Sequence, residues 1–224
     1  MRQPAIVGTA RIVLLVCTPL LLLLSNLYLV ATPAFIRHEY GKAGFPPADV
    51  FSRAERQALA EATLHYLRSN QSPEYLASLS AEGRSVYNER EVKHLVDVEA
   101  VMRGAFLVQG FCLVLALLAL LLSWRLGFCS IALRSVCEGC CILVVGLAVI
   151  GFAAYFSFDL FFTAFHRIFF SGDSWLFAFS DTLIQLFPVA FWMDATWTLA
   201  LLAVAESIAL GCVACLFYRR GLVQ

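Results

Sequence analysis

The residues best suited to chemistry are two histidines, each in a distinctive stretch of sequence. His166 lies in Phe161-Phe-Thr-Ala-Phe-His-Arg-Ile-Phe-Phe-Ser-Gly-Asp-Ser-Trp-Leu-Phe177, where aromatic residues dominate. His94 lies in Tyr87-Asn-Glu-Arg-Glu-Val-Lys-His-Leu-Val-Asp-Val98, just before a long apolar run. Because imidazole titrates near neutral pH, such a pair predicts general acid–base chemistry. Aromatic rings and histidines also collect at membrane–water interfaces without catalysing anything, and this interpretation stays open.

Charged residues surround His94 at helical spacing. On a helix, Arg90, Glu91 and Asp97 lie four before, three before and three after His94, within reach of its side chain. A carboxylate bonded to one ring nitrogen would fix the tautomer and leave the other nitrogen free to act as a base. The alternative is an ordinary solvated charge run at the start of a helix.

The composition is that of an integral membrane protein. Hydrophobic residues make up 61% of the 224 residues and charged residues 14%, and the mean hydropathy is +0.80. These values are far from those of soluble domains. The formal net charge is zero and the chain has no Lys/Arg cluster, so we expect no nucleic-acid partner.

The eight cysteines all fall in apolar segments or in the short loop between two of them. Cys137-Glu-Gly-Cys-Cys141 and Cys212-Val-Ala-Cys215 resemble metal or redox spacings, but a zinc site needs about four converging ligands. We therefore predict that the cysteines are small packing residues and that the protein has no metal site and needs no cofactor.

The apolar runs divide the chain into four spans, which predicts an all-α membrane protein with four transmembrane helices and a small helical extracytoplasmic cap. The expected divisions are an N-terminus and first span at 1–31, the cap at 32–100, spans at 101–124 and 135–158, an aromatic-rich extracytoplasmic interfacial segment at 159–194, and a last span at 195–218. A secretory signal peptide is the competing interpretation of the first run.

The polar insert has helix signals of its own. Ser52-Arg-Ala-Glu55 is a capping box that predicts a helix to about Ser69, with an apolar stripe at Ala54, Ala58, Ala62 and Tyr66 and with His65 facing solvent. Pro73 is expected at the first position of a second helix, to about Leu79. A further helix is expected to run from residue 85 into the second span.

Signals later in the chain predict further helix ends. The third span is expected to continue as the helix that carries His166 and to end near Gly172. Asp181 and Asp194 are predicted N-caps. Glu206, in the middle of the last span, is expected to be buried between helices and paired or neutral.

Arginines predict the orientation. They lie at the N-terminus (Arg2, Arg11), between the second and third spans (Arg125, Arg134) and at the C-terminus (Arg219, Arg220). By the positive-inside rule these segments are cytoplasmic, so the cap and both histidines are expected outside the cell membrane.

The motif pair Asn88-Glu-Arg-Glu-Val-Lys-His-Leu-Val-Asp-Val98 and Phe165-His-Arg-Ile-Phe-Phe-x-x-Asp-x-Trp-Leu-Phe177, followed by Asp181-Thr-Leu-Ile-x-x-x-Pro188, resembles the bacterial lipoprotein intramolecular transacylase family. The resemblance covers nearly the whole chain. It implies a membrane acyltransferase that moves the sn-2 acyl chain of a diacylglyceryl lipoprotein to the amino group of its N-terminal cysteine. The product is an N-acyl lyso-lipoprotein.

The resemblance also implies site residues. His94 and His166 are the expected catalytic pair. The expected supporting residues are Arg90, Glu91, Asp97 and Asp173, and the expected substrate-binding residues are Tyr87, Phe165, Phe169, Phe170, Trp175 and Asp181. The partners expected are the lipoprotein substrate and membrane lipids.

The chemistry suits these residue types. A terminal amine with a pKa near 7.7 to 8.0 must lose a proton before it attacks an ester, and histidine is a suitable base. The substrate brings its own nucleophile, and the chain has no Gly-x-Ser-x-Gly elbow. Two alternatives remain: a membrane lipid-ester hydrolase using the same histidines, and a non-enzymatic structural or interaction protein.

Overall fold

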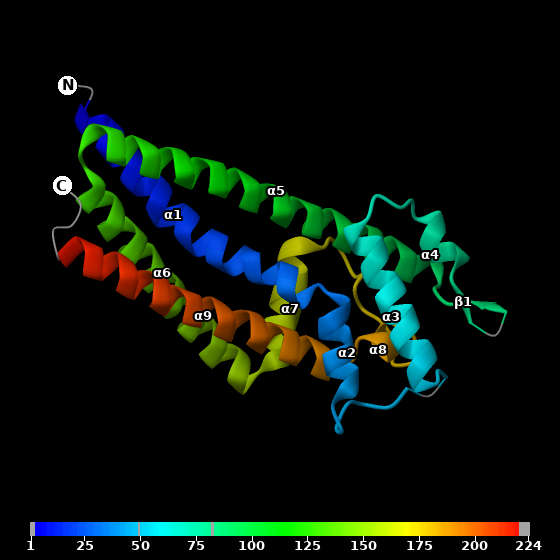
Figure 1. Ribbon diagram of the computed structural model, residues 1–224. Helices are drawn as coiled ribbons and strands as arrows, with labels where there is room; N and C mark the ends of the chain where they lie inside the picture. The colour runs from blue at the N-terminus through cyan, green and yellow to red at the C-terminus, as the bar shows by residue number, and fades with distance from the viewer. Residues whose placement is uncertain (1–2, 49, 82, 220–224) are drawn as a thin grey trace. The chain divides into compact units, whose positions relative to one another are not determined.

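The computed structural model describes residues 3–48, 50–81 and 83–219. Arg2 and Arg220, which contributed to the predicted orientation, lie outside these residues. In the described part, four helices are long and apolar enough to cross a membrane. They are α1 (Gln3–Val30), α5 (Glu89–Leu126), α6 (Cys129–Phe156) and α9 (Val189–Arg219). The chain is therefore an all-α protein with four candidate membrane-spanning helices, as the sequence predicts (Figure 1).

The chain forms two compact units, of which the first contains most of the apolar helical length. It comprises residues 1–27, 105–155 and 198–224, insofar as these are described. Its core is built from small and aliphatic side chains, including Leu14, Cys17, Ala116, Cys140 and Ala214. At one end of this unit lie the start of α1, the turn between α5 and α6, and the end of α9 (Figure 1). Gly127, with φ of 75°, makes that turn in a conformation that favours glycine.

Polar side chains inside this unit pair with one another. The Nδ2 of Asn26, which is fully buried, donates to the Glu206 carboxylate at 2.8 Å. Gln109 similarly donates from Nε2 to Ser25 Oγ at 2.8 Å. Glu206 is thus paired, as expected for a carboxyl group within a membrane span, but it is half-buried and not fully buried as predicted.

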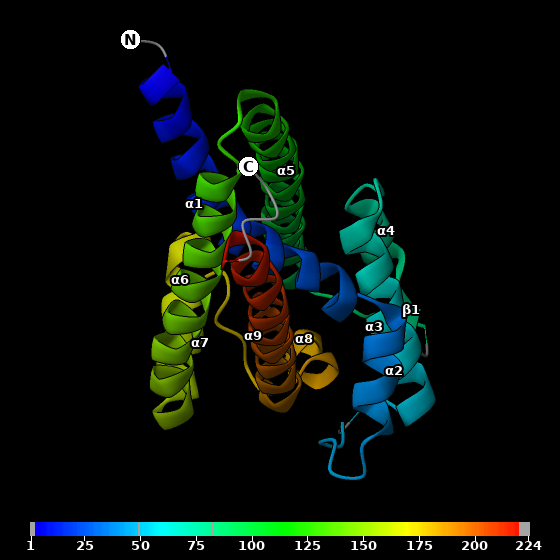
Figure 2. The same cartoon turned by 60° about the vertical axis from the view of Figure 1, so that its left-hand side comes forward.

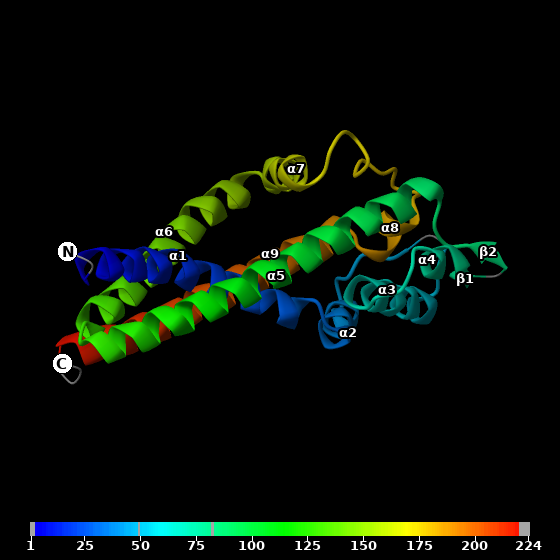
Figure 3. The same ribbon diagram turned by 90° about the horizontal axis from the view of Figure 1, so that it is seen from above.

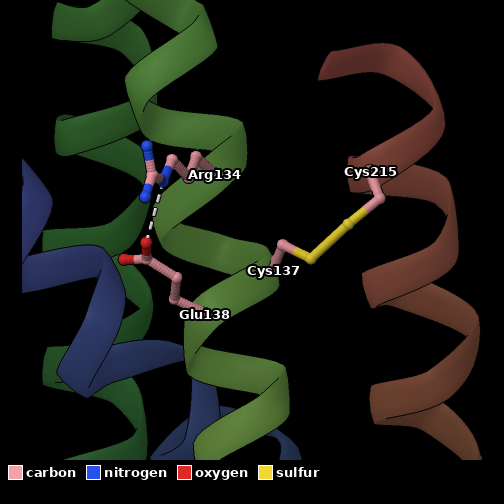
Figure 4. Close-up of a disulfide and its surroundings, with 4 residues drawn as sticks. All are labelled: Arg134, Cys137, Glu138 and Cys215. Carbon is pink, nitrogen blue, oxygen red and sulfur yellow. Dashed lines mark hydrogen bonds and ion pairs between the residues drawn. A yellow bond between two sulfur atoms is a disulfide. The ribbon is translucent and has the colours of Figure 1, made fainter. Parts of the chain in front are cut away.

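A disulfide joins α6 to α9 and corrects one sequence-based prediction. Cys137 and Cys215 are bonded, with Cα atoms 6.3 Å apart, and Figure 4 shows the two side chains meeting between the helices. We predicted that all the cysteines were packing residues, which is wrong for this pair. The error arose because cysteines on different helices give no spacing signal, since their pairing depends on how the helices pack.

The second unit comprises residues 28–104 and 156–197. It contains α2 (Pro33–Gly41), α3 (Arg53–Arg68), α4 (Glu74–Ser78), α7 (Phe158–Phe169) and α8 (Thr182–Leu186), and the adjoining ends of α5 and α9. Two short strands, β1 (Ser80–Ala81) and β2 (Arg84–Ser85), pair antiparallel with Ser80 opposite Ser85. Figure 2 shows α2 beside α3, and Figure 3 shows the connection from α7 to α8.

Tyrosine and leucine side chains make up much of the hydrophobic core of the second unit. The most deeply buried of them are at most 2% exposed: Tyr40, Tyr66, Leu76 and Leu186. The Tyr40 hydroxyl donates to the Leu186 carbonyl at 2.7 Å, and this bond joins α2 to the end of α8. Such a core can hold α8 and the segment before it in a fixed position.

Several local predictions need correction. The capping box at Ser52 and Glu55 is confirmed, and His65 is exposed. However, α3 buries a face containing Arg56, Leu59, Thr63 and Tyr66, whereas Ala54 and Ala58 are exposed. The predicted apolar stripe was therefore wrong at these alanines, because the small alanine side chain is found on both buried and exposed faces of helices.

The helix ends also differ from those predicted. Pro73 is the N-cap of α4 and not its first residue. The α5 helix starts at Glu89 and follows the β1–β2 hairpin. Ser157 interrupts the helix predicted to run on to His166, and it caps α7 instead. Asp194 lies inside α9 and forms an ion pair with Lys42.

Candidate active site

His94 and His166 face one another inside the second unit. His94 is in the second turn of α5 and His166 in the last turn of α7. Their ring centroids are 6.1 Å apart and their planes differ by 21°. The side chains are almost fully buried, with His94 7% and His166 8% exposed. Two imidazoles at this separation can each reach a different atom of one bound ester.

The position of His166 follows from how α7 begins. Ser157 is the N-cap, and its Oγ accepts from the Leu160 amide at 3.4 Å. One turn before His166 in the same helix, the Phe162 carbonyl oxygen lies 2.8 Å from Nδ1 of His166. Since a carbonyl oxygen can only accept, Nδ1 must carry the hydrogen. The Nε2 of neutral His166 therefore has the free lone pair that a base requires.

Aromatic rings enclose the two histidines. Phe162 and Trp175 lie 4.0 Å and 4.9 Å from the His166 ring, centroid to centroid. Phe170 contacts both imidazoles, at 4.9 Å from His94 and 5.4 Å from His166, and Phe177 lies 5.2 Å from His94. This shell excludes water from the imidazoles and offers apolar surface to a lipid.

A glycine turn holds the tryptophan in this shell. Gly172 has φ of 65°, in the left-handed region. Its carbonyl accepts from the indole Nε1 of Trp175 at 3.1 Å. The bond satisfies the polar end of the ring and leaves its apolar surface against His166.

Burial determines the electrostatics of the site. Desolvation by the surrounding side chains lowers the pKa of His166, although the bond to the Phe162 carbonyl opposes this shift. The imidazole of His166 is therefore held neutral at physiological pH. In His94, Nδ1 is buried and has no hydrogen-bond partner among the described residues. A buried polar atom without a partner costs about 1–3 kcal/mol, and a bound substrate could supply the missing partner.

The start of α5 is fixed by a second capping box. The Asn88 side chain accepts from the Glu91 amide at 3.0 Å, and the Glu91 carboxylate accepts from the Asn88 amide at 2.9 Å. The other Glu91 oxygen accepts from the Leu183 amide of α8 at 2.8 Å. Glu91 therefore positions α5 against α8. Glu91 lies within helical reach of His94 in sequence, but both of its carboxylate oxygens accept from backbone amides instead.

Asp181 anchors the loop between α7 and α8 to the same helix start. Its carboxylate accepts from Arg90 Nη2 at 2.7 Å, from Asn88 Nδ2 at 3.2 Å and from the Ala178 amide at 2.7 Å. Arg90 also lies over the Phe177 ring, 5.2 Å from its centroid. Asp181 occupies the N-cap position of α8, but its side chain does not cap that helix. It holds the Phe177 segment beside His94.

Comparison with known proteins gives this geometry a family context. The sequence profile of the lipoprotein intramolecular transacylase family, Lit, matches residues 12–192. The chain belongs to the lipoprotein intramolecular transacylase family. It is therefore an acyltransferase of the lipoprotein-modifying class in a membrane.

One protein sequence and two solved structures illustrate what this chain is similar to. An uncharacterized protein of Aquifex aeolicus is 27% identical over 186 residues, covering 75% of this chain and 76% of that protein. The solved structure of the membrane-integral transacylase Lit from Bacillus cereus matches with a TM-score of 0.74 and 14% identity, covering 97% of this chain and 98% of that one. A variant of that enzyme with one histidine replaced by arginine matches with a TM-score of 0.68 and 14% identity, covering 98% of this chain and 95% of that one. At this identity the structures show a shared fold.

The remaining predicted site residues do not all lie beside the two histidines. Tyr87 is buried in the core, where its hydroxyl bonds Thr63, so it is not at a binding surface. Burial raises its pKa. Asp97 is half-buried and forms no hydrogen bond with His94 in the described part of the chain. Phe165 and Phe169 are partly exposed, at 41% and 49%.

Asp173 lies beside a shallow pocket of about 560 Å³. Lys93, Ser171 and Ser174 line this pocket with it, and they are sequence neighbours of His94, Phe170 and Trp175. Asp173 thus lies near the two histidines in sequence and in the pocket lining, but among the described residues no interaction joins it to either imidazole. In the same residues, no group of three or more His, Cys, Asp or Glu side chains could hold a metal ion.

Two residues important to this site escaped the sequence-based prediction. Phe162 provides the carbonyl that selects the tautomer of His166, but a backbone acceptor has no residue signature. Asn88 provides the cap of α5, and the pattern Asn-x-x-Glu was a visible cap signal in which we considered only Glu91, as a residue supporting catalysis.

Proposed function

We propose that this transacylase moves the sn-2 acyl chain of a diacylglyceryl lipoprotein to the α-amino group of its N-terminal cysteine, with His166 and His94 as the acid–base pair. The observation that carries the proposal is the pair of buried imidazoles 6.1 Å apart within an aromatic shell. Family membership supports the substrate class. The transfer to the cysteine amine is the finer step that we infer.

The reaction needs only one net proton movement. The amine nitrogen forms a bond with the ester carbonyl carbon, and the bond from that carbon to the glyceryl oxygen breaks. The proton lost by the nitrogen ends on the glyceryl oxygen. Water is not consumed and no electrons are exchanged, so two groups that accept and return one proton suffice.

His166 is the proposed base. Its Nδ1 hydrogen is engaged by Phe162, so Nε2 can accept the proton that the attacking amine loses. The lowered pKa of His166, caused by desolvation, ensures that the lone pair is available at neutral pH. An imidazole with a lowered pKa also releases its proton readily in the following step.

His94 is the proposed group for the developing oxygen charge. Its Nδ1 is buried and unpartnered, and it can interact with the oxyanion or with the departing glyceryl oxygen. A donor in a water-excluded site stabilises such a charge more strongly than it does in water. His166 then returns its proton to the departing glyceryl oxygen, while His94 binds the oxygen that carries the developing negative charge.

The outer surface of α7 provides the proposed contact with lipid. Leu160 and Ile168 are 71% and 75% exposed, and Phe165 and Phe169 are partly exposed on the same helix. A short helix with one apolar, exposed surface suits the boundary between headgroups and acyl chains. We propose that the acyl chains approach the histidines along this helix.

The proposed orientation places residues 32–100 and 159–194 on the extracytoplasmic side. Arg11 and Arg134 share the Glu138 carboxylate, and Arg125 lies in the last turn of α5. The positive-inside rule favours the cytoplasm for helix ends that carry such arginines. Thiol labelling of a cysteine introduced at Asn70, in a background without other cysteines, tests this. Labelling from the cytoplasmic side alone would contradict the orientation.

The deciding experiment is mass spectrometry of N-terminal lipopeptides from a diacylglyceryl lipoprotein, with and without this protein expressed. We expect a product of unchanged mass whose fragmentation places one acyl chain on the cysteine nitrogen. A blocked, acetylated N-terminus should abolish the reaction while leaving binding intact. Release of free fatty acid, with loss of one acyl mass, would instead show a hydrolase.

A further inference from the structure

A second recess lies in the first unit, which does not contain the histidines. Its volume is about 580 Å³, within the range of small-molecule sites. Helices α1, α6 and α9 all contribute to it. Leu15 and Ile142 provide apolar wall, and Arg134, Tyr218 and Arg219 provide polar groups.

The charges at this recess do not balance. Glu138 accepts from Arg134 Nε at 2.9 Å and from Arg11 Nη2 at 3.2 Å. One carboxylate is thus shared by two guanidinium groups, and Arg219 adds a third positive charge. The local excess is two positive charges. Because Arg134 bonds Glu138 through Nε, its terminal amino groups can also donate to an anion.

The wall beneath these charges is covalently fixed. Cys137 and Cys215 line the recess, and their disulfide joins α6 to α9 (Figure 4). Gly139 brings α6 close to α1, since a Cβ there would lie 3.2 Å from the Leu15 carbonyl oxygen and 3.0 Å from Thr18. The three helices therefore form a preorganised wall.

A ligand for this recess must combine a negative charge with an apolar tail. Guanidinium groups bind phosphate well, because their planar donors match its oxygens. The recess lies at the ends of membrane-spanning helices, where basic pockets between helices bind anionic lipid headgroups. We propose that the recess is a binding site for one anionic phospholipid, with its phosphate at Arg134 and Arg219 and an acyl chain along Leu15 and Ile142.

Native mass spectrometry of the full-length protein in neutral detergent tests this site. The chain is titrated with phosphatidylglycerol, and phosphatidylcholine of the same acyl composition is the neutral control. We expect one phosphatidylglycerol to bind at least tenfold more tightly than phosphatidylcholine. Equal affinity for the two lipids would overturn the proposal. Inorganic phosphate that binds as tightly as the lipid would overturn it also, because the acyl chain would then contribute nothing.

Charge variants separate this site from nonspecific attraction. A charge near a lipid surface contributes about fivefold in affinity, so Arg134→Gln should weaken phosphatidylglycerol binding about fivefold and the Arg134→Gln, Arg219→Gln double variant about 25-fold. Glu138→Gln, which removes the opposing charge, should strengthen binding about fivefold. Arg125→Gln is the matched control, since Arg125 lies over Trp124 at the end of α5 and does not line the recess.

A conservative variant distinguishes the loss of a binding charge from the loss of the folded structure. Arg134→Lys keeps the charge and should retain most of the affinity, with an unchanged melting temperature for both Arg134 variants. Equal weakening by Arg125→Gln and Arg134→Gln would contradict a defined site. None of these measurements depends on transacylation, so this site is tested separately from the histidine chemistry.

Discussion

The Nδ1 of His166 lies 2.8 Å from the carbonyl oxygen of Phe162, one helical turn earlier in α7. This bond uses a backbone group of the same helix to fix the tautomer, where many enzymes use a carboxylate. A neutral carbonyl does not stabilise the imidazolium as a carboxylate would. The histidine therefore stays a weak, readily reversible base, which suits a reaction that must return the proton within one turnover.

The first prediction concerns the two imidazoles. Replacing His166 or His94 with Gln should lower the rate of acyl transfer by at least about 100-fold, because general acid–base catalysis contributes about that much or more. Initial rates with a synthetic diacylglyceryl lipopeptide measure this. His65→Gln is the control, since His65 is exposed on α3. Full activity in a variant lacking both site histidines would refute the mechanism.

The second prediction concerns pH. Protonation of the substrate amine, with a pKa near 7.7 to 8.0, should make the rate fall tenfold per pH unit below that range. An ordinary histidine would add a second loss below about pH 6.5. Because burial lowers the pKa of His166, we expect the slope to stay near one below pH 6.5 and to steepen only at lower pH. A break near 6.5 in the profile of kcat/KM would contradict this.

The same shift affects stability. As the pH falls, His166 in the unfolded chain has its ordinary pKa and therefore binds a proton at a higher pH than it does in the folded chain. The stability contributed by neutral, buried His166 is therefore present above about pH 6.5 and lost as the pH falls through the lowered pKa.

The third prediction distinguishes a structural Glu91 from a catalytic one. Glu91→Ala removes the carboxylate half of the capping box of α5 and leaves the Asn88 and Leu183 amides without their acceptor, which should cost about 3 kcal/mol. Thermal melting measures the loss. Glu55→Ala, in the exposed capping box of α3, should cost only about 1 kcal/mol. A Glu91→Gln variant with unchanged melting but lost activity would show instead that Glu91 acts on His94.

The fourth prediction concerns a buried carboxylate near the start of α9. Glu39 is 1% exposed and bonds Lys42 Nζ at 2.8 Å, while Lys42 also bonds Asp194 at 2.7 Å. Lys42→Ala leaves Glu39 without its cation and should destabilise the protein by about 3 kcal/mol. The control Arg37→Ala removes an exposed pair with Glu61 and should cost at most about 1 kcal/mol. Equal melting temperatures for the two variants would contradict the prediction.

The fifth prediction concerns the disulfide. Alkylation of the denatured protein with an iodoacetamide should modify six cysteines before reduction and all eight after it, because Cys137 and Cys215 are bonded. Intact-mass measurement gives the count. The cells are best quenched in acid, since the proposed cytoplasmic position of this end exposes it to a reducing compartment. Eight modified cysteines before reduction would show that the bond does not form in the cell.

The sequence was sufficient for features that depend on local pattern. Continuous apolar runs predicted the four long helices, and the Ser52–Glu55 capping box predicted the start of α3. The pairing of His94 and His166 was also anticipated, because the motifs that contain them resemble those of one enzyme family. These signals are carried by neighbouring residues, so one sequence is enough to show them.

Features that depend on tertiary contact could not be predicted. Glu91 was expected to support catalysis because it lies at helical spacing from His94, and Asp181 was expected to bind substrate because of the family resemblance. In the structure the Glu91 carboxylate binds the Leu183 amide and the Asp181 carboxylate binds Arg90. Tyr87 was expected to bind substrate and is a core residue. In each case the partner lies about 20 or more residues away in sequence, and no periodicity connects the two.

The Cys137–Cys215 bond closes residues 137–215 into a covalent ring, and the rest of the chain is attached to this ring at the two bonded cysteines. His166 lies within this ring and His94 lies outside it. One cut of the backbone within the ring would leave every fragment attached to the rest of the protein. One cut between residues 95 and 136 would sever the only covalent path that joins the two histidines. Proteolysis between residues 95 and 136 therefore separates the two histidines, whereas proteolysis between residues 138 and 214 leaves them covalently joined.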